Sequence, residues 1–328
     1  MTDDADAFHV AVTGGAGYIG SRVVHELQRA HPEWTVTALD NFYLGQVRAV
    51  GGVSVEHVDV RNRDRLEDAL SGADVVCHLA AISGVDDCRE QSDLAYEVNV
   101  TGTNNVAWHC RKHGTGLVFP FSMATLGNPQ EFPATVDHPR DPLNWYGRTK
   151  LLGERAIESF ADGAFPTHQF MISNLYGSHE IDGQQVSKGT VTNFFVGRAL
   201  AGETLTVYEP GTQARNYIHV VDVARAYVRS AERLAESLAA DETGVRKYEL
   251  ASDEDPSVGD LAELVQRLAR EERDVDVDVE LVSNPRAGEE TLVSEFPVDT
   301  SRTREELDWE AERSLEVTVR EALRAPSE

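Results

Sequence analysis

Short apolar runs alternate with amphipathic stretches along the first half of the chain. The apolar runs have the length and composition of buried β-strands, and they cover residues 8–13, 35–39, 53–58, 74–79 and 117–121. One amphipathic stretch follows Gly20 and has Val23, Val24 and Leu27 on one face. Two others cover 64–70 and 93–112. This alternation predicts an α/β fold with a doubly wound parallel sheet, in which ligands bind at the carboxyl ends of the strands.

The pattern becomes looser in the second half. A strand over 168–173 ends at Asn174, and residues 177–215 contain glycine-rich loops with one helix at about 190–201. A helix over 221–238 and a strand over 247–250 are expected to return to the sheet. We therefore expect residues 1–177 to form a nucleotide-binding domain that 216–252 rejoins, and 178–215 with 253–328 to form a smaller substrate-binding lobe. The acidic tract 271–280 is expected to be a solvated strand edge and loop.

A glycine-rich turn, Gly14–Gly20, follows the first predicted strand and leads into the first helix. Glycines at 14, 17 and 20 permit a tight turn, close approach of the backbone to a pyrophosphate, and close packing of helix on strand. The amides and the positive dipole end of the helix then face the phosphates. This context predicts a dinucleotide-binding domain of the Rossmann type over residues 1–177.

The second predicted strand ends at Asp40, 20 residues after Gly20. An acidic side chain at this position accepts hydrogen bonds from the adenosine ribose hydroxyls and repels a 2′-phosphate. The expected cofactor is therefore NAD rather than NADP. The alternative is that Asp40 is only a turn residue at the end of its strand.

The chain is strongly acidic, with a net charge of −26 from 56 acidic and 30 basic residues. Only four of the basic residues are lysine. Concentrated salt screens such a surface, which suggests a protein from a high-salt cytoplasm; a generic acidic enzyme is the alternative. This charge argues against a nucleic acid or an anionic membrane as partner.

The chain contains no long apolar run, and its first seven residues are acidic and polar, unlike a signal peptide. We therefore expect a cytoplasmic protein. Cys77, Cys88 and Cys110 form no CxxC pair and predict no disulfide framework. His109 and His113 are four residues apart, but no carboxylate or third histidine accompanies them in a recognisable metal pattern, so no metal site is expected.

The candidate chemistry lies at Tyr146 and Lys150. Their spacing places both side chains on one face of a helix. A phenol has an unperturbed pKa of about 10, and an adjacent ammonium lowers that pKa and makes the phenol a better base. Ser122 directly follows the fifth predicted strand, where a parallel sheet binds its ligands, although an isolated serine there could be a helix cap.

With these motifs in order, the sequence resembles the extended short-chain dehydrogenase/reductase family, in particular its sugar-nucleotide epimerases and dehydratases. The match runs almost end to end, through the segments 13–20, 40–41, 59–60, 78–81, 99–103, 122, 146–150, 174–177, 215–220 and 286–289. The resemblance implies NAD-binding at Gly14, Gly17, Tyr18, Ile19, Gly20, Asp40, Asn41, Asp59, Val60, Leu79, Ala80, Ala81, Asn99, Tyr146 and Lys150. Asp59 is expected to contact the adenine.

The resemblance also assigns catalysis to Ser122, Tyr146 and Lys150. Tyr146 would take the proton from a sugar hydroxyl, Ser122 would hydrogen-bond the same oxygen, and Lys150 would hold the nicotinamide ribose and lower the pKa of Tyr146. The implied substrate-binding residues are Ser83, Ser122, Asn174, Lys188, Arg215 and Arg286. A guanidinium suits a diphosphate, but both arginines could instead form surface salt bridges, and Lys188 could be a plain loop lysine.

Two departures from the family pattern matter. Its dehydratases carry Asp-Glu directly after the Ser/Thr, where this chain has Met123 and Ala124, neither of which can transfer a proton. This disfavours a dehydratase. The family tends to have a tyrosine in the turn after Ser122, where this chain has Leu126.

The leading hypothesis is an NAD-dependent epimerase acting at C4 of a UDP-hexose through a transient keto sugar. The alternatives are a dehydrogenase that oxidises a sugar, sugar acid or nucleotide sugar with net turnover of the cofactor, and a non-catalytic NAD-binding protein. The resemblance further suggests a homodimer formed through the helices at about 93–112 and 147–160, whose apolar positions could equally be ordinary core.

Overall fold

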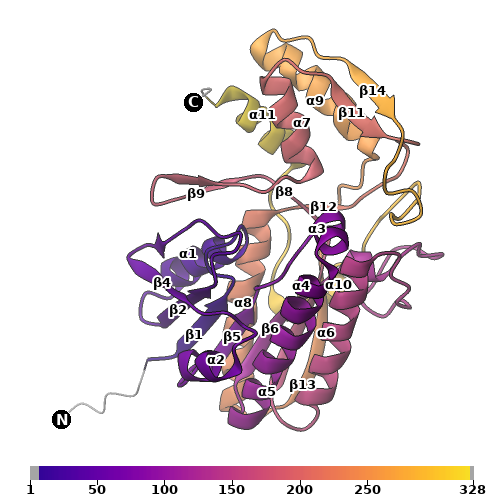
Figure 1. Cartoon of the computed structure of the whole chain (residues 1–328). Coiled ribbons are helices and arrows are strands. Elements are labelled where there is room, and N and C mark those ends of the chain that lie inside the picture. Colours follow the sequence, from indigo (N-terminus) through magenta and orange to yellow (C-terminus); the bar gives the residue numbers. More distant parts are fainter. Residues whose placement is uncertain (1–6, 326–328) are drawn as a thin grey trace.

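A computed structural model describes residues 7–325 of the chain and contains a large, mostly parallel sheet (Figure 1). Its eight strands lie in the order β13-β7-β6-β5-β1-β2-β4-β3, and only the β3–β4 pair is antiparallel. The strands are β1 (His9–Thr13), β2 (Thr35–Asp40), β3 (Ala49–Val50), β4 (Val53–His57), β5 (Val75–His78), β6 (Gly116–Ser122), β7 (Pro166–Ile172) and β13 (Gly244–Leu250). The predicted doubly wound sheet is confirmed, with every predicted strand present; β3 was missed because two residues carry no periodic signal.

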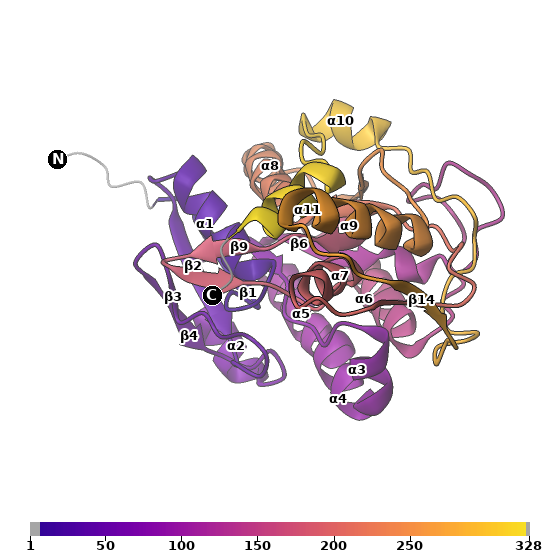
Figure 2. The ribbon, with the colours of Figure 1, turned by 90° about the horizontal axis from the view of Figure 1, so that it is seen from above.

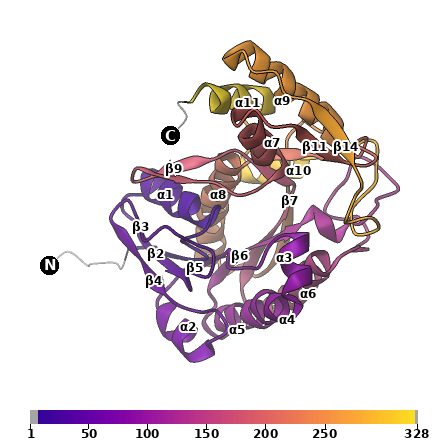
Figure 3. The same ribbon diagram turned by 45° about the horizontal axis from the view of Figure 1, so that its top comes forward.

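Helices cover both faces of this sheet (Figures 1 and 3). On one face, α1 (Gly20–Ala30) packs against α8 (Val220–Ala239). On the other face, α2 (Arg63–Ala69) packs against α5 (Thr103–His113), which packs in turn against α6 (Trp145–Ala161). Each face has its own apolar core, so the central strands are buried on both sides, as their continuous apolar runs predict.

The predicted helix over 93–112 is interrupted in the structure. It consists of α4 (Ser92–Tyr96), a π-helical segment (Glu97–Gly102) and α5. Gly102 lies so close to Val60 that a Cβ atom there would be 2.6 Å from the valine Cγ2. The apolar period alone does not reveal such a widened turn, which often marks a functional region.

A smaller group of elements lies beyond the carboxyl ends of the strands (Figures 1 and 2). Its helices are α7 (Val191–Leu200), α9 (Val258–Arg273) and α11 (Leu315–Arg324), which share a third apolar core. Its strand pairs are β8 (Asn174–Tyr176) with β12 (Tyr217–His219), β9 (His179–Ile181) with β10 (Gln184–Val186), and β11 (Leu205–Tyr208) with β14 (Val279–Val282). The tract 271–280, predicted as strand edge and loop, begins as the last turn of α9 and ends in β14.

Part of the C-terminal region returns to the large sheet, although the sequence placed all of 253–328 in the substrate lobe. Helix α10 (Ser301–Leu307) packs against β13 and α8. Thr303 Oγ1 donates to the Glu249 carbonyl over 2.9 Å, and Trp309 Nε1 donates to the Asp222 carbonyl over 2.9 Å. These contacts hold α10 and the segment after it against the sheet and α8, while the rest of the two-lobe division stays a prediction.

Within residues 7–325, no helix has both the length and the apolar character needed to span a bilayer. The three cysteines are buried and form no disulfide there. The expectation of no signal peptide is based on the first seven residues. Six of these, residues 1–6, lie outside the described part of the chain.

Candidate active site

A cavity of about 800 Å³ opens at the carboxyl ends of the parallel strands. It begins at the loop after β1, passes the ends of β2, β5 and β6, and reaches the segment after β7. Sixteen of the predicted site residues line it: Gly14, Gly17, Tyr18, Ile19, Gly20, Asp40, Asn41, Val60, Leu79, Ala80, Ala81, Ser83, Ser122, Tyr146, Lys150 and Lys188. Asp59, Asn99, Asn174, Arg215 and Arg286 are not among its lining residues.

The glycine-rich turn is packed too closely for side chains. Gly14 has a φ of +73°, and a Cβ atom there would lie 2.7 Å from the Ala80 amide nitrogen. A Cβ atom at Gly20 would lie 2.0 Å from the Gly14 carbonyl oxygen. Ile19 is the N-cap residue of α1, and its side chain makes no hydrogen bond to the first amides of the helix. The start of this helix lines the cavity. The turn therefore suits the pyrophosphate of a dinucleotide.

Tyr18 ties this turn to the smaller lobe. Its hydroxyl donates to the carbonyl oxygens of Tyr176 and Gly177 over 2.9 and 2.6 Å. Burial raises the pKa of the Tyr18 hydroxyl, which therefore stays protonated and donates. The contact fixes the position of the turn relative to β8.

Asp40 lines the cavity at the end of β2. Its carboxylate accepts the amide of Ala16 over 3.1 Å and that of Phe42 over 2.7 Å. Burial raises the pKa of this carboxyl above its usual range. Next to it, Asn41 donates to Asp59 over 3.1 Å. Asp59 lies behind the lining, where an ion pair with Arg61 at 2.7 Å lowers the pKa of the Asp59 carboxyl.

Ser122 and Tyr146 meet where α6 begins. Asn144 is the N-cap of α6 and accepts the Gly147 amide over 2.8 Å. A Cβ atom at Gly147 would lie 2.6 Å from the Ala124 carbonyl oxygen, so the first turn of α6 packs directly on the short turn after β6. Ser122 caps that turn, and it also lies close enough to Tyr146 to lower the pKa of the Tyr146 hydroxyl. The two predictions for Ser122, cap and site residue, therefore describe the same side chain.

The pKa of Tyr146 differs from the sequence-based expectation. Burial raises it to about 12, and the nearby Ser122 side chain offsets only part of this rise. The expectation that Lys150 lowers the pKa of Tyr146 below its usual value is therefore wrong for the protein without its cofactor, because burial dominates. Burial also lowers the pKa of Lys150 to about 8, and its ammonium donates to the Pro120 carbonyl over 3.0 Å. The positive charge of NAD⁺ would lower the pKa of Tyr146.

Asn99 lies behind the cavity wall. Its side chain accepts the Ile82 amide over 2.8 Å and donates to the Ile82 carbonyl over 2.9 Å. It also donates to the Thr149 hydroxyl over 3.0 Å. Asn99 therefore fixes the loop after β5 against α6 and is itself buried.

The predicted diphosphate-binding arginines are paired with carboxylates. Arg286 Nε donates to Asp86 over 3.0 Å, and its Nη1 lies 3.2 Å from Glu290. Arg215 lies 3.8 Å from the same Glu290. Asn174 donates to the Asn216 carbonyl over 3.1 Å. The salt-bridge alternative raised for both arginines therefore describes their state in this structure.

Several lining residues carried no sequence signal. They include Gln184, Gln185 and Val186 of the β9–β10 hairpin, residues 43–47, Arg61 and Asp87. The hairpin residues come from a stretch that the sequence analysis read as loop. They reach the cavity only because the chain folds back over the turn that follows β1.

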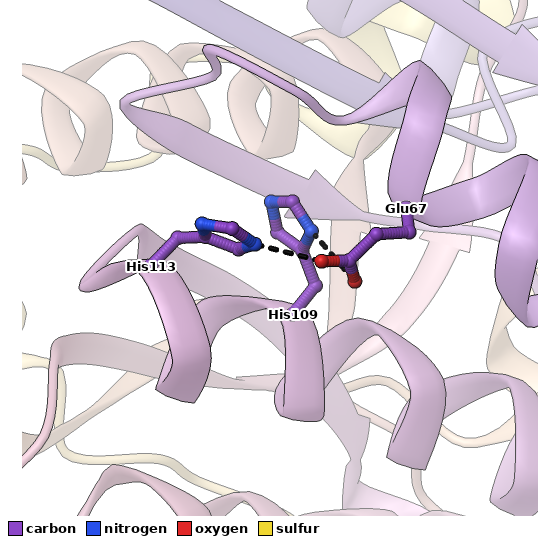
Figure 4. Close-up of side chains that lie close together, drawn as sticks. All are labelled: Glu67, His109 and His113. Carbon is purple, nitrogen blue, oxygen red and sulfur yellow. Dashed lines mark hydrogen bonds and ion pairs between the residues drawn. The ribbon is translucent and has the colours of Figure 1, made fainter.

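A second cluster of polar groups lies away from this cavity, where α2 meets α5 (Figure 4). Glu67 is 3.3 Å from His109 Nδ1 and 2.7 Å from His113 Nε2. A carboxylate does accompany the two histidines in the folded protein, so the expectation that none would is wrong. Their ligand atoms lie within 4.8 Å of one another, a composition that zinc accepts. However, Lys112 donates to Glu67 over 2.6 Å and holds the pKa of that carboxyl down at about 2, so the charge is balanced without an ion.

Comparisons with known proteins agree with this geometry. The chain belongs to the NAD dependent epimerase/dehydratase family, whose model matches residues 10–242. It is 30% identical to UDP-glucose 4-epimerase 4 of Oryza sativa subsp. japonica, over 95% of this chain and 88% of that one. It is thus an NAD-dependent epimerase of the extended short-chain dehydrogenase/reductase type.

Two solved structures are also similar. One is the UDP-glucose 4-epimerase of Thermus thermophilus in complex with NAD, with a TM-score of 0.78, 25% identity, and coverage of 96% of this chain and 98% of that one. The other is MoeE5 in complex with UDP-glucuronic acid and NAD, with a TM-score of 0.76, 26% identity, and coverage of 95% and 96%.

Proposed function

We propose that this enzyme epimerises a UDP-hexose at C4. The observation that carries the proposal is that Ser122, Tyr146 and Lys150 line the same cavity. The two residues after Ser122, Met123 and Ala124, have no group that transfers a proton. Tyr146 is thus the evident acid and base, which suits reversible oxidation of an alcohol better than elimination of water.

In the proposed reaction, the Tyr146 oxygen takes the proton of the C4 hydroxyl while Ser122 hydrogen-bonds the same sugar oxygen. Lys150 binds the nicotinamide ribose, and its charge favours the phenolate. When bound, NAD⁺ accepts the hydride from C4 and later returns it. The keto sugar turns within the cavity, so that the hydride returns to the opposite face of C4 while Tyr146 gives the proton back to the C4 oxygen.

The proposed diphosphate site uses Arg215 and Arg286, with Asn174 beside it. Each arginine is close to Glu290, and Arg286 also binds Asp86. A diphosphate would replace these carboxylates with phosphate oxygens of the same charge sign. Binding therefore involves an exchange of ion pairs rather than the filling of a free site.

The relatives support a UDP-sugar substrate. The rice and Thermus thermophilus proteins are UDP-glucose 4-epimerases, and MoeE5 was solved with UDP-glucuronic acid. Similar chains of this fold therefore take both a neutral and an acidic hexose on the same nucleotide.

The test is a coupled assay with UDP-glucose and UDP-glucuronic acid in concentrated potassium chloride. The proposal expects interconversion with the C4 epimer and no net reduction of added NAD⁺. Steady NADH production without an epimer would favour the dehydrogenase alternative and contradict the proposal. If a Tyr146→Phe strain had the same phenotype as the wild-type strain, this would favour the non-catalytic alternative.

We also propose that the enzyme is a homodimer through α5 and α6. Trp108 on α5 is 42% exposed and Leu152 on α6 is 44% exposed, and both are large apolar side chains. Two such groups on adjacent helices suit an interface with a second copy. Light scattering of the wild type and of Leu152→Glu tests this, with a shift to monomer expected only in the variant.

A further inference from the structure

Lys188 is the lysine of the cavity that the proposed mechanism does not use. It lies between β10 and α7, and its half-buried side chain lines the cavity together with Ser83, Tyr146 and Lys150. Its ammonium donates to the Ser83 hydroxyl and lies 3.4 Å from the Ser83 carbonyl oxygen. Among residues 7–325, no carboxylate lies within 4 Å of it. Lys188 is thus held in place by neutral groups.

The other lysines show that this state is not typical of the chain. Lys112 binds Glu67 at 2.6 Å, and Lys247 binds Glu158 at 2.6 Å. Lys150 has no carboxylate partner in the described chain either, and it is the lysine assigned to the cofactor ribose. Although the protein has 56 acidic residues, the two lysines that line the cavity have no carboxylate partner in the described chain and can bind an anionic ligand.

The ammonium group of Lys188 also acts on that of Lys150. Burial lowers the pKa of Lys188, and the charge of Lys188 in turn lowers the pKa of Lys150. Asp87 lines the same part of the cavity and offsets some of this repulsion from more than 4 Å away. A bound anion between these groups would relieve the remaining cost of two close cations.

The position of Lys188 indicates which anion this is. The cofactor pyrophosphate has its own site at Gly14–Gly20, and the substrate diphosphate has the two arginines around Glu290. Lys188 instead donates to Ser83 after β5, and its charge acts on Lys150, one helical turn from Tyr146, where the sugar ring reacts in the proposed function. The anion nearest to Lys188 would therefore belong to the sugar itself.

We propose that Lys188 binds a carboxylate of the sugar, so that the preferred substrate is a nucleotide-linked uronic acid. One carboxylate oxygen accepts from the Lys188 ammonium, and the Ser83 hydroxyl, which already accepts from Lys188, donates to the other. The proposal rests on the proposed epimerase function and adds the class of sugar. Lys188 is a specificity residue in this account, while Tyr146 remains the acid and base.

The test compares kcat/KM for UDP-glucuronic acid and UDP-glucose in four proteins: wild type, Lys188→Met, Lys188→Arg and the control Lys112→Met. A charge-assisted hydrogen bond contributes enough for a 10- to 100-fold effect. We expect the wild type to prefer UDP-glucuronic acid by at least 10-fold. We expect Lys188→Met to lose 10- to 100-fold on UDP-glucuronic acid and less than threefold on UDP-glucose. Lys188→Arg should restore part of the loss, and Lys112→Met should match the wild type.

Inhibition by UDP alone separates the two sources of negative charge, because UDP carries the diphosphate without the sugar. An unchanged UDP inhibition constant in Lys188→Met supports the sugar carboxylate. A rise equal to the loss on UDP-glucuronic acid would assign Lys188 to the diphosphate and overturn the proposal. Equal losses on both sugars, or a wild type that prefers UDP-glucose, would also overturn it.

A binding measurement keeps this inference separate from the proposed function. Calorimetric titration of the NAD-loaded protein with UDP-glucuronic acid needs no turnover. Selective weakening in Lys188→Met would support the carboxylate site even if neither sugar were epimerised. Epimerisation of UDP-glucose with no effect of Lys188 on either sugar would leave the function standing and reject the site.

Discussion

The cofactor end of the cavity and the proposed diphosphate site are built in different ways. At the cofactor end, backbone groups hold each residue, as in the close approach of Gly14 to Ala80 and the hydrogen bonds of Asp40 to the amides of Ala16 and Phe42. At the proposed diphosphate site, whose arginines lie outside the cavity lining, charged side chains from distant parts of the chain hold one another. Arg286 and its partner Asp86 are 200 residues apart in the sequence. The cofactor end is therefore preformed, whereas in the proposed function the diphosphate site exchanges ion-pair partners when a ligand binds.

The largest test of this contrast is Tyr146→Phe, at the point where the cofactor and the substrate meet in the proposed function. Loss of the general acid and base should lower kcat by about 10²- to 10⁴-fold. The dissociation constant of NAD should stay within about threefold, because the preformed end is untouched. Tyr43→Phe, which removes an exposed hydroxyl at the rim of the cofactor end, is the control and should leave kcat unchanged. A parallel loss of NAD binding in Tyr146→Phe would show that the two binding sites are not separate.

The same contrast explains what the sequence could predict. Gly14–Gly20, Asp40 and the Tyr146–Lys150 spacing are local patterns whose geometry follows from one strand, one turn or one helix. The β9–β10 hairpin and the pairing of Arg286 with Asp86 depend on where distant segments meet. The pKa of Tyr146 is another such property, since burial by the whole fold outweighs the neighbouring lysine. Local patterns thus located the site but not its electrostatic state.

Lys150 should give a pH-dependent contribution to stability in the NAD-free protein. Its pKa is lowered to about 8 from a usual value of 10.5. Below pH 8 the ammonium is charged in both the folded and unfolded states, and its burial destabilises the fold fully. Between pH 8 and 10 the unfolded chain binds more protons, so this destabilisation diminishes as the pH rises.

The measurement is the free energy of unfolding of wild type minus that of Lys150→Met, by denaturant titration at each pH. Groups other than Lys150, such as the buried cysteines, cancel in this difference. We expect the difference to become more favourable by about 2 to 3 kcal/mol between pH 7.5 and 10. A flat difference would mean that the Lys150 ammonium remains solvated in the folded protein.

A substitution at Asp40 tests how strongly NAD binding depends on the preformed geometry of the cofactor end. Asp40→Asn removes the charge and places an amide donor against one of the two backbone amides, those of Ala16 and Phe42, that donate to the separate oxygens of Asp40. We expect NAD to bind about 10- to 100-fold more weakly, as for the loss of hydrogen bonds to a charged group, and NADP to be discriminated less. Asp87→Asn makes the same change at the sugar end of the cavity and should leave NAD affinity unaltered, as judged by fluorescence titration.

The smallest effect is expected at the proposed diphosphate site, from Asp86→Asn. This variant frees Arg286 from a partner that competes with the diphosphate. Both side chains are partly exposed, at 39% and 31%, so the pair contributes about 0 to 1 kcal/mol. UDP should therefore bind up to about fivefold more tightly by calorimetry.

Asp137→Asn is the matched control for Asp86→Asn, because it breaks another exposed ion pair, with Arg302 at 2.8 Å, and changes the net charge equally. The gain in UDP affinity should appear only in Asp86→Asn and should shrink at 1 M salt, where the Debye length falls to about 3 Å. Weaker UDP binding in Asp86→Asn would mean that Asp86 orients Arg286 for the diphosphate instead of competing with it. The diphosphate site would then be as preformed as the cofactor end.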